Sequence, residues 1–507
     1  MELNIKKQSV CVNELSFNQN AEQGIDFTVN IPEYCGKVER LLKYNLIPRI
    51  NSKVLNGQTL TIEGEAYFSL IFVDENGCVL GHEYVAPFSK SIDIGNVIDC
   101  YKITAKPKCS YLNAKVISSS RIDVNSVVEL SVSIYSKKST EVISNIDCTD
   151  VYQNCGEIRA TTPVSSAEKN MIIDEELEIP AGMPALRKIL WHNASVIIGD
   201  TKIVNNKVIT KGEFKLHVLY CSDDVHSPVH FDETVPFSQI IEMENINNNC
   251  GCHVSAEIAS YDIKPRSNYE GEVRNISLCA KLLLTADAHC DNNITVVLDA
   301  YSPKIPAVTE TCNTQFYEHK NTISEVFVCK KKLEFSDGEL GNLIDAWCTS
   351  TLQGYRIEEN HLHISGTVLV CGITVCDGSA SYFERPIDFE YKSPLNDLPE
   401  CVKIEPEITV LNSDFQIVGG SVLEVGVELS LSAEIYENCH AELLCSFTTD
   451  ADADKKKSDC SMVIYYAERG ELTWNIAKRY GASPEDIMTV NNIETVVPDN
   501  MPIIISC

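Results

Sequence analysis

The chain has 507 residues, of which 44% are hydrophobic and 22% charged, and its formal net charge is −30. This length exceeds a single hydrophobic core and predicts three to four domains. The acidic balance argues against a nucleic-acid-binding surface, which needs clustered Lys and Arg, and against adsorption to anionic lipid. The sequence shows no apolar leader and no run of about 18 apolar residues, so we expect a cytosolic protein without a membrane span.

The first part of the chain contains three similar segments at a period of about 150 residues, far longer than a solenoid repeat. They cover residues 41–70, 189–218 and 343–372. Each consists of an alternating strand, a turn rich in Asn or Gly and a second alternating strand, which predicts a hairpin. The second strands share one glycine position, and a glycine there marks a bulge or a close backbone approach. These glycines are Gly64, Gly212 and Gly366.

Each repeat continues with a Pro-Phe element and two closing strands. The Pro-Phe elements are residues 86–89, 235–238 and a degraded copy at 385–389. The closing strands are 103–116 with 127–135, 254–264 with 273–285, and 402–417 with 423–436. Short alternating strands with frequent turns predict β-sandwiches or barrels. We therefore expect a mostly β protein with three such domains at 1–140, 141–292 and 293–445, and at most a helical turn after Pro32 and after Pro180.

A charged, low-complexity stretch is expected to act as a flexible linker over residues 446–460. Beyond it, residues 461–507 predict a small α+β module. Residues 463–466 suit a strand, and the spacing of Ile476, Ala477 and Tyr480 favours one helix face that ends at Gly481. Ser483, with Pro484 and Asp486 behind it, predicts a capped second helix that ends at 491–492. Residues 503–505 form the closing strand.

This strand–helix–helix–strand order resembles a LysM domain, a module that anchors proteins to glycans or partners. The family usually has Gly-Asp-Thr-Leu-Trp in its first loop, whereas this chain has Gly470-Glu-Leu-Thr-Trp474. The exchange places Leu472 where sugar-binding members present a hydroxyl, which favours a protein partner. A one-residue shift of the helix start would bury Leu472 instead, and the sequence leaves both interpretations open.

The β repeats, with Ile-Pro entries at 31–32 and 179–180, resemble tandem SPOCS domains. SPOCS domains followed by one LysM domain are the arrangement of the SipL-type spore-coat morphogenetic proteins of endospore-forming bacteria. The resemblance implies a non-enzymatic scaffold for spore coat assembly. It would lie in the mother-cell cytoplasm at the forespore surface, become part of the spore coat, and bind other coat proteins. Its LysM domain would bind the basement-layer coat ATPase, SpoIVA.

Two sets of binding residues follow from these alternatives. For a protein partner, an exposed apolar cluster is the expected centre of the interface. Its members would be Tyr466, Leu472, Trp474, Ile493 and Val496. Tyr466 and Trp474 have a second interpretation, packing in the small core. For a peptidoglycan-binding protein of cell wall or cortex, the groove would consist of Gly470, Glu471, Thr473, Asn491, Asn492 and Ile493.

The sequence contains none of the common phosphate-loop, metalloprotease or serine-hydrolase motifs. We therefore predict no catalytic residues, no cofactor and no metal; a wall hydrolase is a weaker alternative that lacks a catalytic pair. The patterns closest to a metal site are Cys250-Gly-Cys252-His253 and His361-Leu-His363. Most of the 22 cysteines are interpreted as small buried side chains, with oxidative cross-linking in a late assembly as an alternative. Disulfide pairing, oligomeric state and the role of each repeat stay open.

Overall fold

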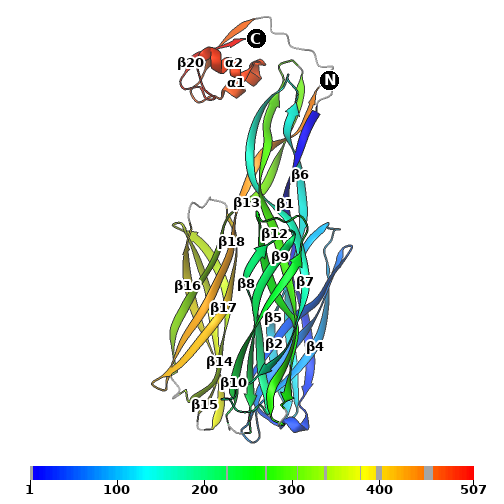
Figure 1. Cartoon of the computed structure of the whole chain (residues 1–507), viewed down its shortest axis with the longest axis vertical. Coiled ribbons are helices and arrows are strands. Elements are labelled where there is room, and N and C mark those ends of the chain that lie inside the picture. The colour runs from blue at the N-terminus through cyan, green and yellow to red at the C-terminus, as the bar shows by residue number, and fades with distance from the viewer. Residues whose placement is uncertain are drawn as a thin grey trace.

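The protein is elongated and built almost entirely of antiparallel strands (Figure 1). The computed structural model describes residues 4–223, 227–268, 271–304, 306–335, 340–376, 378–395, 402–449 and 461–506. Three β units lie side by side at one end, and their longest strands continue into a narrower stem. A small module that carries the C-terminus lies beside the tip of this stem.

The three units, here called repeats 1, 2 and 3, have the same six-strand order. Repeat 1 contains β1 (Asn4–Asn30), the 3-10 turn η1 (Glu33–Cys35), β2 (Val38–Asn56), β3 (Thr59–Asp74), β4 (Val79–Asp93), β5 (Cys100–Ser118) and β6 (Arg121–Asp147). Repeat 2 contains β7 (Tyr152–Glu178), β8 (Lys188–Ile203), β9 (Lys207–Cys221), β10 (Val229–Glu242), β11 (Cys250–Ser267) and β12 (Val273–Tyr301). Repeat 3 contains β13 (Ala307–Glu334), β14 (Asn342–Glu358), β15 (His361–Cys376), β16 (Ser379–Pro394), β17 (Val402–Val418) and β18 (Val422–Thr449).

Each repeat forms two three-stranded sheets that face each other. In repeat 1 the sheets are β1-β6-β5 and β2-β3-β4, and repeats 2 and 3 follow the same pattern. The mostly β prediction and the predicted hairpins are confirmed. Two features differ from the sequence prediction. The long first strand of each repeat was not predicted. The expected boundaries at 140, 292 and 445 fall within β6, β12 and β18, and the expected linker begins inside β18 and then lies outside the described residues. The residues after Pro180, where at most a helical turn was expected, form a turn without helical structure.

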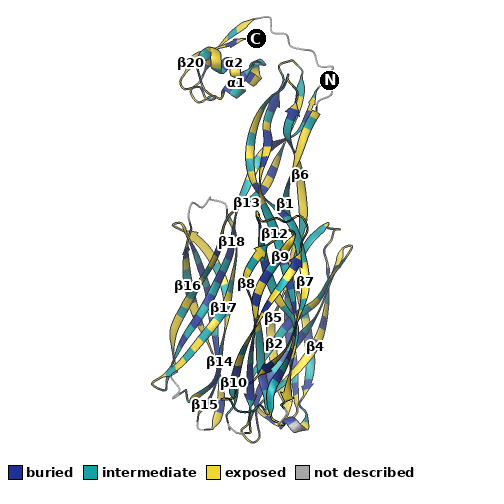
Figure 2. Cartoon of the chain, in the orientation of Figure 1, coloured by how far each residue is buried: buried dark blue, intermediate teal, exposed yellow. Residues whose placement is uncertain are grey.

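Side-chain alternation explains how each repeat closes over its core. Along β3 the buried positions alternate with exposed or half-buried ones, and the same holds for β9 and β15 (Figure 2). Period-two alternation places one row of side chains between the two sheets. Each repeat therefore has its own apolar cluster, drawn from both of its sheets.

The shared glycines are needed because an aromatic ring covers them from the neighbouring strand. Gly64 pairs with Phe88, and a Cβ on Gly64 would lie 2.2 Å from the Arg49 carbonyl oxygen and 2.5 Å from the Phe88 ring. Gly212 and Gly366 are covered in the same way, by Phe237 and Phe389 respectively. The predicted close approach is confirmed, and the Phe of the Pro-Phe element is the residue that causes it.

The three repeats are arranged around a common pseudo-threefold axis. In the stem, β1, β7 and β13 contact one another in a cycle, and β6, β12 and β18 do the same. Corresponding side chains meet there, since Val142, Val296 and Leu443 share one cluster. A second cluster joins Ile143, Val297 and Leu444 with Ile146, Ala300 and Phe447. The stem is thus one core to which all three repeats contribute.

A second shared core lies at the lower end of the axis. It contains Ile71, Leu219 and Ile373, which occupy corresponding positions in the central strands β3, β9 and β15. A bulge in each first hairpin strand adds one more apolar residue, at Leu42, Leu190 and Ile344. Because a bulge turns a side chain out of the regular alternation, these residues reach the neighbouring repeats instead of their own core.

Near this core, one polar contact crosses each of the three interfaces between repeats, and the residues that form it differ from one interface to the next. Glu83 of repeat 1 accepts from His192 of repeat 2, with 2.9 Å between Oε1 and Nε2. Between repeats 2 and 3, the His217 Nε2 lies 2.9 Å from an oxygen of Asp345, whose side chain is 1% exposed. Glu384 of repeat 3 closes the ring by pairing with Lys43 of repeat 1. Different partners at the three interfaces favour one cyclic order of repeats.

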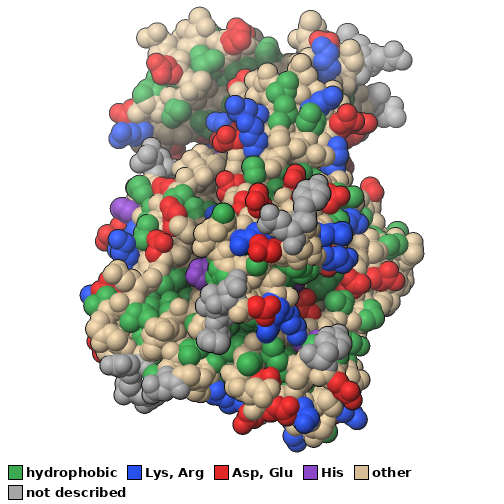
Figure 3. Space-filling view, turned by 60° about the horizontal axis from the view of Figure 1, so that its bottom comes forward, with side chains coloured by type: hydrophobic (Ala, Val, Ile, Leu, Met, Phe, Trp, Pro, Cys, Tyr) green, Lys and Arg blue, Asp and Glu red, His purple; other side chains and the backbone are tan. Residues whose placement is uncertain are grey.

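The outer surface carries mixed charge. On the face shown in Figure 3, Lys and Arg side chains are scattered among Asp and Glu. Within the described part of the chain, no helix is both long enough and apolar enough to cross a membrane.

Candidate functional site

The C-terminal module folds in the predicted order of β19 (Met462–Ala467), α1 (Thr473–Tyr480), α2 (Pro484–Asn491) and β20 (Met501–Ser506). Gly481 ends α1 with a φ of 64°, a left-handed conformation that glycine adopts without strain. The Ser483 hydroxyl accepts a hydrogen bond from the Asp486 backbone N–H at 3.2 Å and so caps α2. Each of these local predictions is confirmed.

The loops that precede α1 and follow α2 are joined by backbone hydrogen bonds. The Thr473 N–H donates to the Thr495 carbonyl at 3.0 Å, and the Val497 N–H donates to the Glu471 carbonyl at 2.9 Å. This short ladder sets Leu472 opposite Val496, and their side chains are 45% and 44% exposed. The shift that would have buried Leu472 is absent, because Leu472 is the N-cap of α1 and Thr473 is the buried residue. The two loops thus present a paired apolar surface, here called the loop pair.

A second apolar surface lies on the outward face of the β19–β20 sheet. Tyr466 is 77% exposed there, and it shares the face with Met462, Ile464 and Ile504, which are also exposed. Residues on the opposite face of the same strands, including Ile503 and Ile505, are buried in the module core. Tyr466 is therefore a surface residue, whereas Ile493 is half-buried and packs against the core.

The residues expected to form a glycan groove mostly bind their own module. The Asn491 amide donates to the Ile487 and Ile504 carbonyls and its oxygen accepts from the Ile504 N–H, all at 2.7–2.8 Å. The Glu471 carboxylate accepts from the Tyr465 hydroxyl at 3.1 Å. The Thr473 hydroxyl is buried and donates to the Thr495 carbonyl. Asn492 is exposed, and Gly470 takes the turn with a φ of 88°.

Trp474 points toward repeat 2. Its indole N–H donates to Asp299 at 2.8 Å, and the Lys478 ammonium contacts both oxygens of the same carboxylate at 2.7 and 2.8 Å. The Trp474 ring lies edge-on to Tyr301, with 5.0 Å between centroids. The Tyr301 hydroxyl donates to the Ala482 carbonyl at 2.8 Å and is buried. The helix α1 thus docks the module on the last residues of β12.

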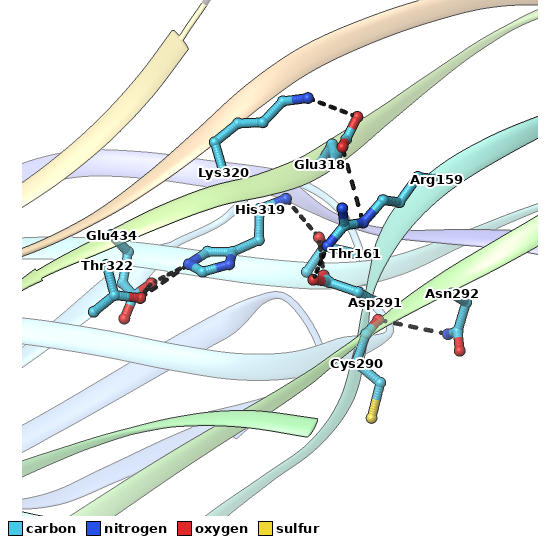
Figure 4. A network of polar contacts seen from close by, with 10 residues as sticks. All are labelled: Arg159, Thr161, Cys290, Asp291, Asn292, Glu318, His319, Lys320, Thr322 and Glu434. Atoms are coloured by element: carbon cyan, nitrogen blue, oxygen red, sulfur yellow. Dashed lines mark hydrogen bonds and ion pairs between the residues drawn. The ribbon is translucent and has the colours of Figure 1, made fainter. Parts of the chain in front are cut away.

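A polar network joins repeats 2 and 3 at the base of the stem (Figure 4). Asp291 accepts from Thr161 at 2.6 Å and from Arg159 at 3.2 Å, and the Thr161 hydroxyl in turn accepts from the His319 backbone N–H at 2.7 Å. The His319 ring lies 2.8 Å from Glu434, which raises the His319 pKa. Each charged group in this network faces an opposite charge. The contacts of Thr161 with His319 and of Arg159 with Glu318 cross from repeat 2 to repeat 3, so the network joins the two repeats.

The candidate metal ligands are engaged in other ways. Cys250 forms a disulfide with Cys290 on the adjacent strand, so its sulfur is not free to act as a ligand in the Cys250-Gly-Cys252-His253 pattern. Glu318, Glu437 and Cys439 lie close together, but the Lys320 ammonium already bridges both carboxylates, at 2.9 and 2.8 Å. His361 and His363 have ring centroids 6.5 Å apart and belong to no such group among the described residues.

Sequence reasoning missed the docking contact. Asp299 and Tyr301 lie in a strand far from the module in sequence, and neither the alternation of β12 nor the charge pattern distinguishes them. Leu472 was singled out by its departure from the family pattern, and the structure places it opposite Val496 with both side chains exposed. Trp474 was assigned either to the same surface or to the small core, and it packs against the module core and contacts Asp299 and Tyr301 of repeat 2.

Comparison with known families identifies one region. A family model described as SipL, SPOCS domain matches residues 186–265, which span β8 to β11 of repeat 2. No curated protein and no solved structure matches the chain. The matched domain indicates a role related to the spore coat.

Proposed function

We propose that this protein is a non-enzymatic scaffold for spore coat assembly, held at the forespore surface by its C-terminal module. The module, interpreted as a LysM domain, binds the basement-layer coat ATPase. The protein acts in the mother-cell cytoplasm and then stays in the coat. The observation that carries this proposal is the exposed loop pair, considered together with the SipL-type domain in repeat 2.

The composition of the loop pair favours a protein over a sugar. A sugar-binding groove needs hydrogen-bonding groups directed at the ligand, yet Asn491, Glu471 and Thr473 direct theirs into the module. Two adjacent apolar side chains, Leu472 and Val496, supply the desolvated centre that protein interfaces use. The net charge of −30 favours a partner surface with a basic rim around an apolar centre.

The body supports the scaffold part of the proposal. Its three repeats share cores along the axis, so they hold their outer sheet faces in fixed relative positions. A rigid block with several outward faces is suited to recruiting further coat proteins.

The test measures binding of the full chain to two baits, the purified basement-layer ATPase and purified peptidoglycan. We expect binding to the ATPase, and a loss of affinity of about tenfold or more for Leu472→Ser, the usual effect of removing a central interface residue. Val490→Ser is the matched control, because Val490 is an exposed apolar residue on α2 and is not part of the loop pair. Binding to peptidoglycan alone would replace this proposal with a wall- or cortex-binding function.

A further inference from the structure

The position of Asp299 and Tyr301 has counterparts in the other two repeats. Each long closing strand has one bulge in the stem, after which Asn145, Asp299 and Ser446 are the first paired residues. Two positions later come Asp147, Tyr301 and Thr448. These are three equivalent places at the end of the stem, and they differ in chemistry.

Only repeat 2 has the groups that α1 requires. A carboxylate at the first position accepts both the Trp474 N–H and the Lys478 ammonium, which the Ser446 hydroxyl of repeat 3 cannot match. The ring of Tyr301 packs at a tilt against that of Tyr152, its partner across the ladder, and contacts Trp474. The corresponding pairs are Asn4 with Asp147 and Val308 with Thr448, and neither provides an aromatic platform.

We infer that Asp299 and Tyr301 form a dedicated docking site for α1, which selects one of three equivalent positions and fixes the orientation of the module. Docking covers one side of α1 and leaves the loop pair exposed. The partner surface is therefore the loop pair with the outward face of the β19–β20 sheet, and Trp474 and Lys478 position the module without touching the partner. This last consequence rests on the proposed function, whereas the docking site itself does not.

The chemistry explains why the dock is specific. Charge-assisted hydrogen bonds to a half-buried carboxylate are among the stronger polar contacts, and two donors converge on Asp299. The buried hydroxyl of Tyr301 pairs with the Ala482 carbonyl in the turn between α1 and α2. Together they fix two points of the module and thereby restrict its rotation about the contact.

The test uses the three tryptophans of the full chain, labelled with 5-fluorotryptophan. The fluorine resonance of Trp474 is assigned with Trp474→Phe, and those of Trp191 and Trp347 report whether the body is intact. We expect Asp299→Ala to shift the Trp474 resonance and expose it to solvent, with docking weakened about tenfold or more. Asp299→Asn keeps an acceptor for the indole but loses the charge, so it should be intermediate. Ser446→Ala, at the equivalent position of repeat 3, should change nothing.

One result would overturn the docking site, and a second would overturn only its consequence for the partner surface. One is a Trp474 resonance that is solvent-exposed in the unmodified chain and unaffected by both Asp299→Ala and Tyr301→Ala. The other is a Trp474 resonance that moves to the released position when the coat ATPase binds, since the partner would then need the docked face. A wild-type chain that does not bind the ATPase would refute the proposed function and leave the docking result intact.

Discussion

The three repeats and the C-terminal module use apolar residues in opposite ways. In the repeats, apolar side chains that do not belong to the core of their own sandwich pack against one another on the common axis, as Ile71, Leu219 and Ile373 do. In the module, the apolar side chains outside the core are exposed on the surface, at Tyr466 and the loop pair. The difference indicates that the repeats bury one another's apolar surfaces within a single chain, whereas the module keeps an apolar surface available to another molecule. It also suggests that the body unfolds as one unit and the module separately.

The largest effect is expected from Gly64→Val in repeat 1. A side chain there would overlap the Arg49 carbonyl and the Phe88 ring, and we expect a loss of about 4 kcal/mol or more in unfolding free energy. Because the cores are shared, the whole body should lose stability while hydrogen exchange in α1 and α2 changes little. Gly24→Val is the control, since nothing lies within 4 Å of its added Cβ. Destabilisation confined to repeat 1 would show that the repeats are independent.

His217→Ala probes the contact between repeats 2 and 3. Burial lowers the pKa of His217, but hydrogen bonds to Asp232 and Asp345 outweigh this and raise it to about 10. The variant leaves Asp345 buried without its partner, which costs about 3 kcal/mol in urea unfolding at pH 6. His361→Ala, at an exposed histidine, should have almost no effect.

The same pair predicts a pH dependence. A histidine whose pKa is higher in the folded protein stabilises it fully below about pH 6.5, its value in an unfolded chain. This contribution is lost as pH rises from 6.5 toward 10, so the urea midpoint of the unmodified chain should fall across that window. A difference between the unmodified chain and His217→Ala that stays constant with pH would contradict the assignment.

The disulfide in repeat 2 should contribute a similar amount. Cys250 and Cys290 are 40 residues apart, and a crosslink over such a loop typically contributes about 3 kcal/mol. The Cys250→Ala/Cys290→Ala variant should be weakened by this amount and become insensitive to reductant in thermal unfolding. Cys279→Ala, at an exposed free thiol, should keep the reductant sensitivity of the unmodified chain. Equal sensitivity in the double variant would show that another cysteine pair is responsible.

The smallest effect should appear in the module alone. Ser483→Ala removes the cap of α2 and should cost about 1 kcal/mol, measured by hydrogen exchange in α2, with the repeats unchanged. Thr489→Ala is the control, because its hydroxyl only bonds back to the Glu485 carbonyl and alanine favours the helix. An equal loss in the repeats would mean that body and module unfold together.

Local patterns determined most of the secondary structure. Alternation predicted the hairpins, the shared glycines predicted the close approach that Phe88, Phe237 and Phe389 confirm, and Ser483 with Gly481 predicted the helix ends. The long strand that opens each repeat was missed. Its inner end belongs to a sandwich and its outer end to the stem, so its buried positions do not follow one alternating pattern.

The sequence by itself determined the hairpin and closing strands, the turns, the repeat and the order of the module, because each depends on neighbouring residues with a fixed period. Only the tertiary structure decided that the repeats close around an axis and that α1 docks on Asp299. One sign of the axis was present: the later parts of β3, β9 and β15 are buried on both faces, where alternation gives way to continuous apolar runs. Such a run shows that a second surface is covered, but which residues cover it depends on long-range packing between distant strands.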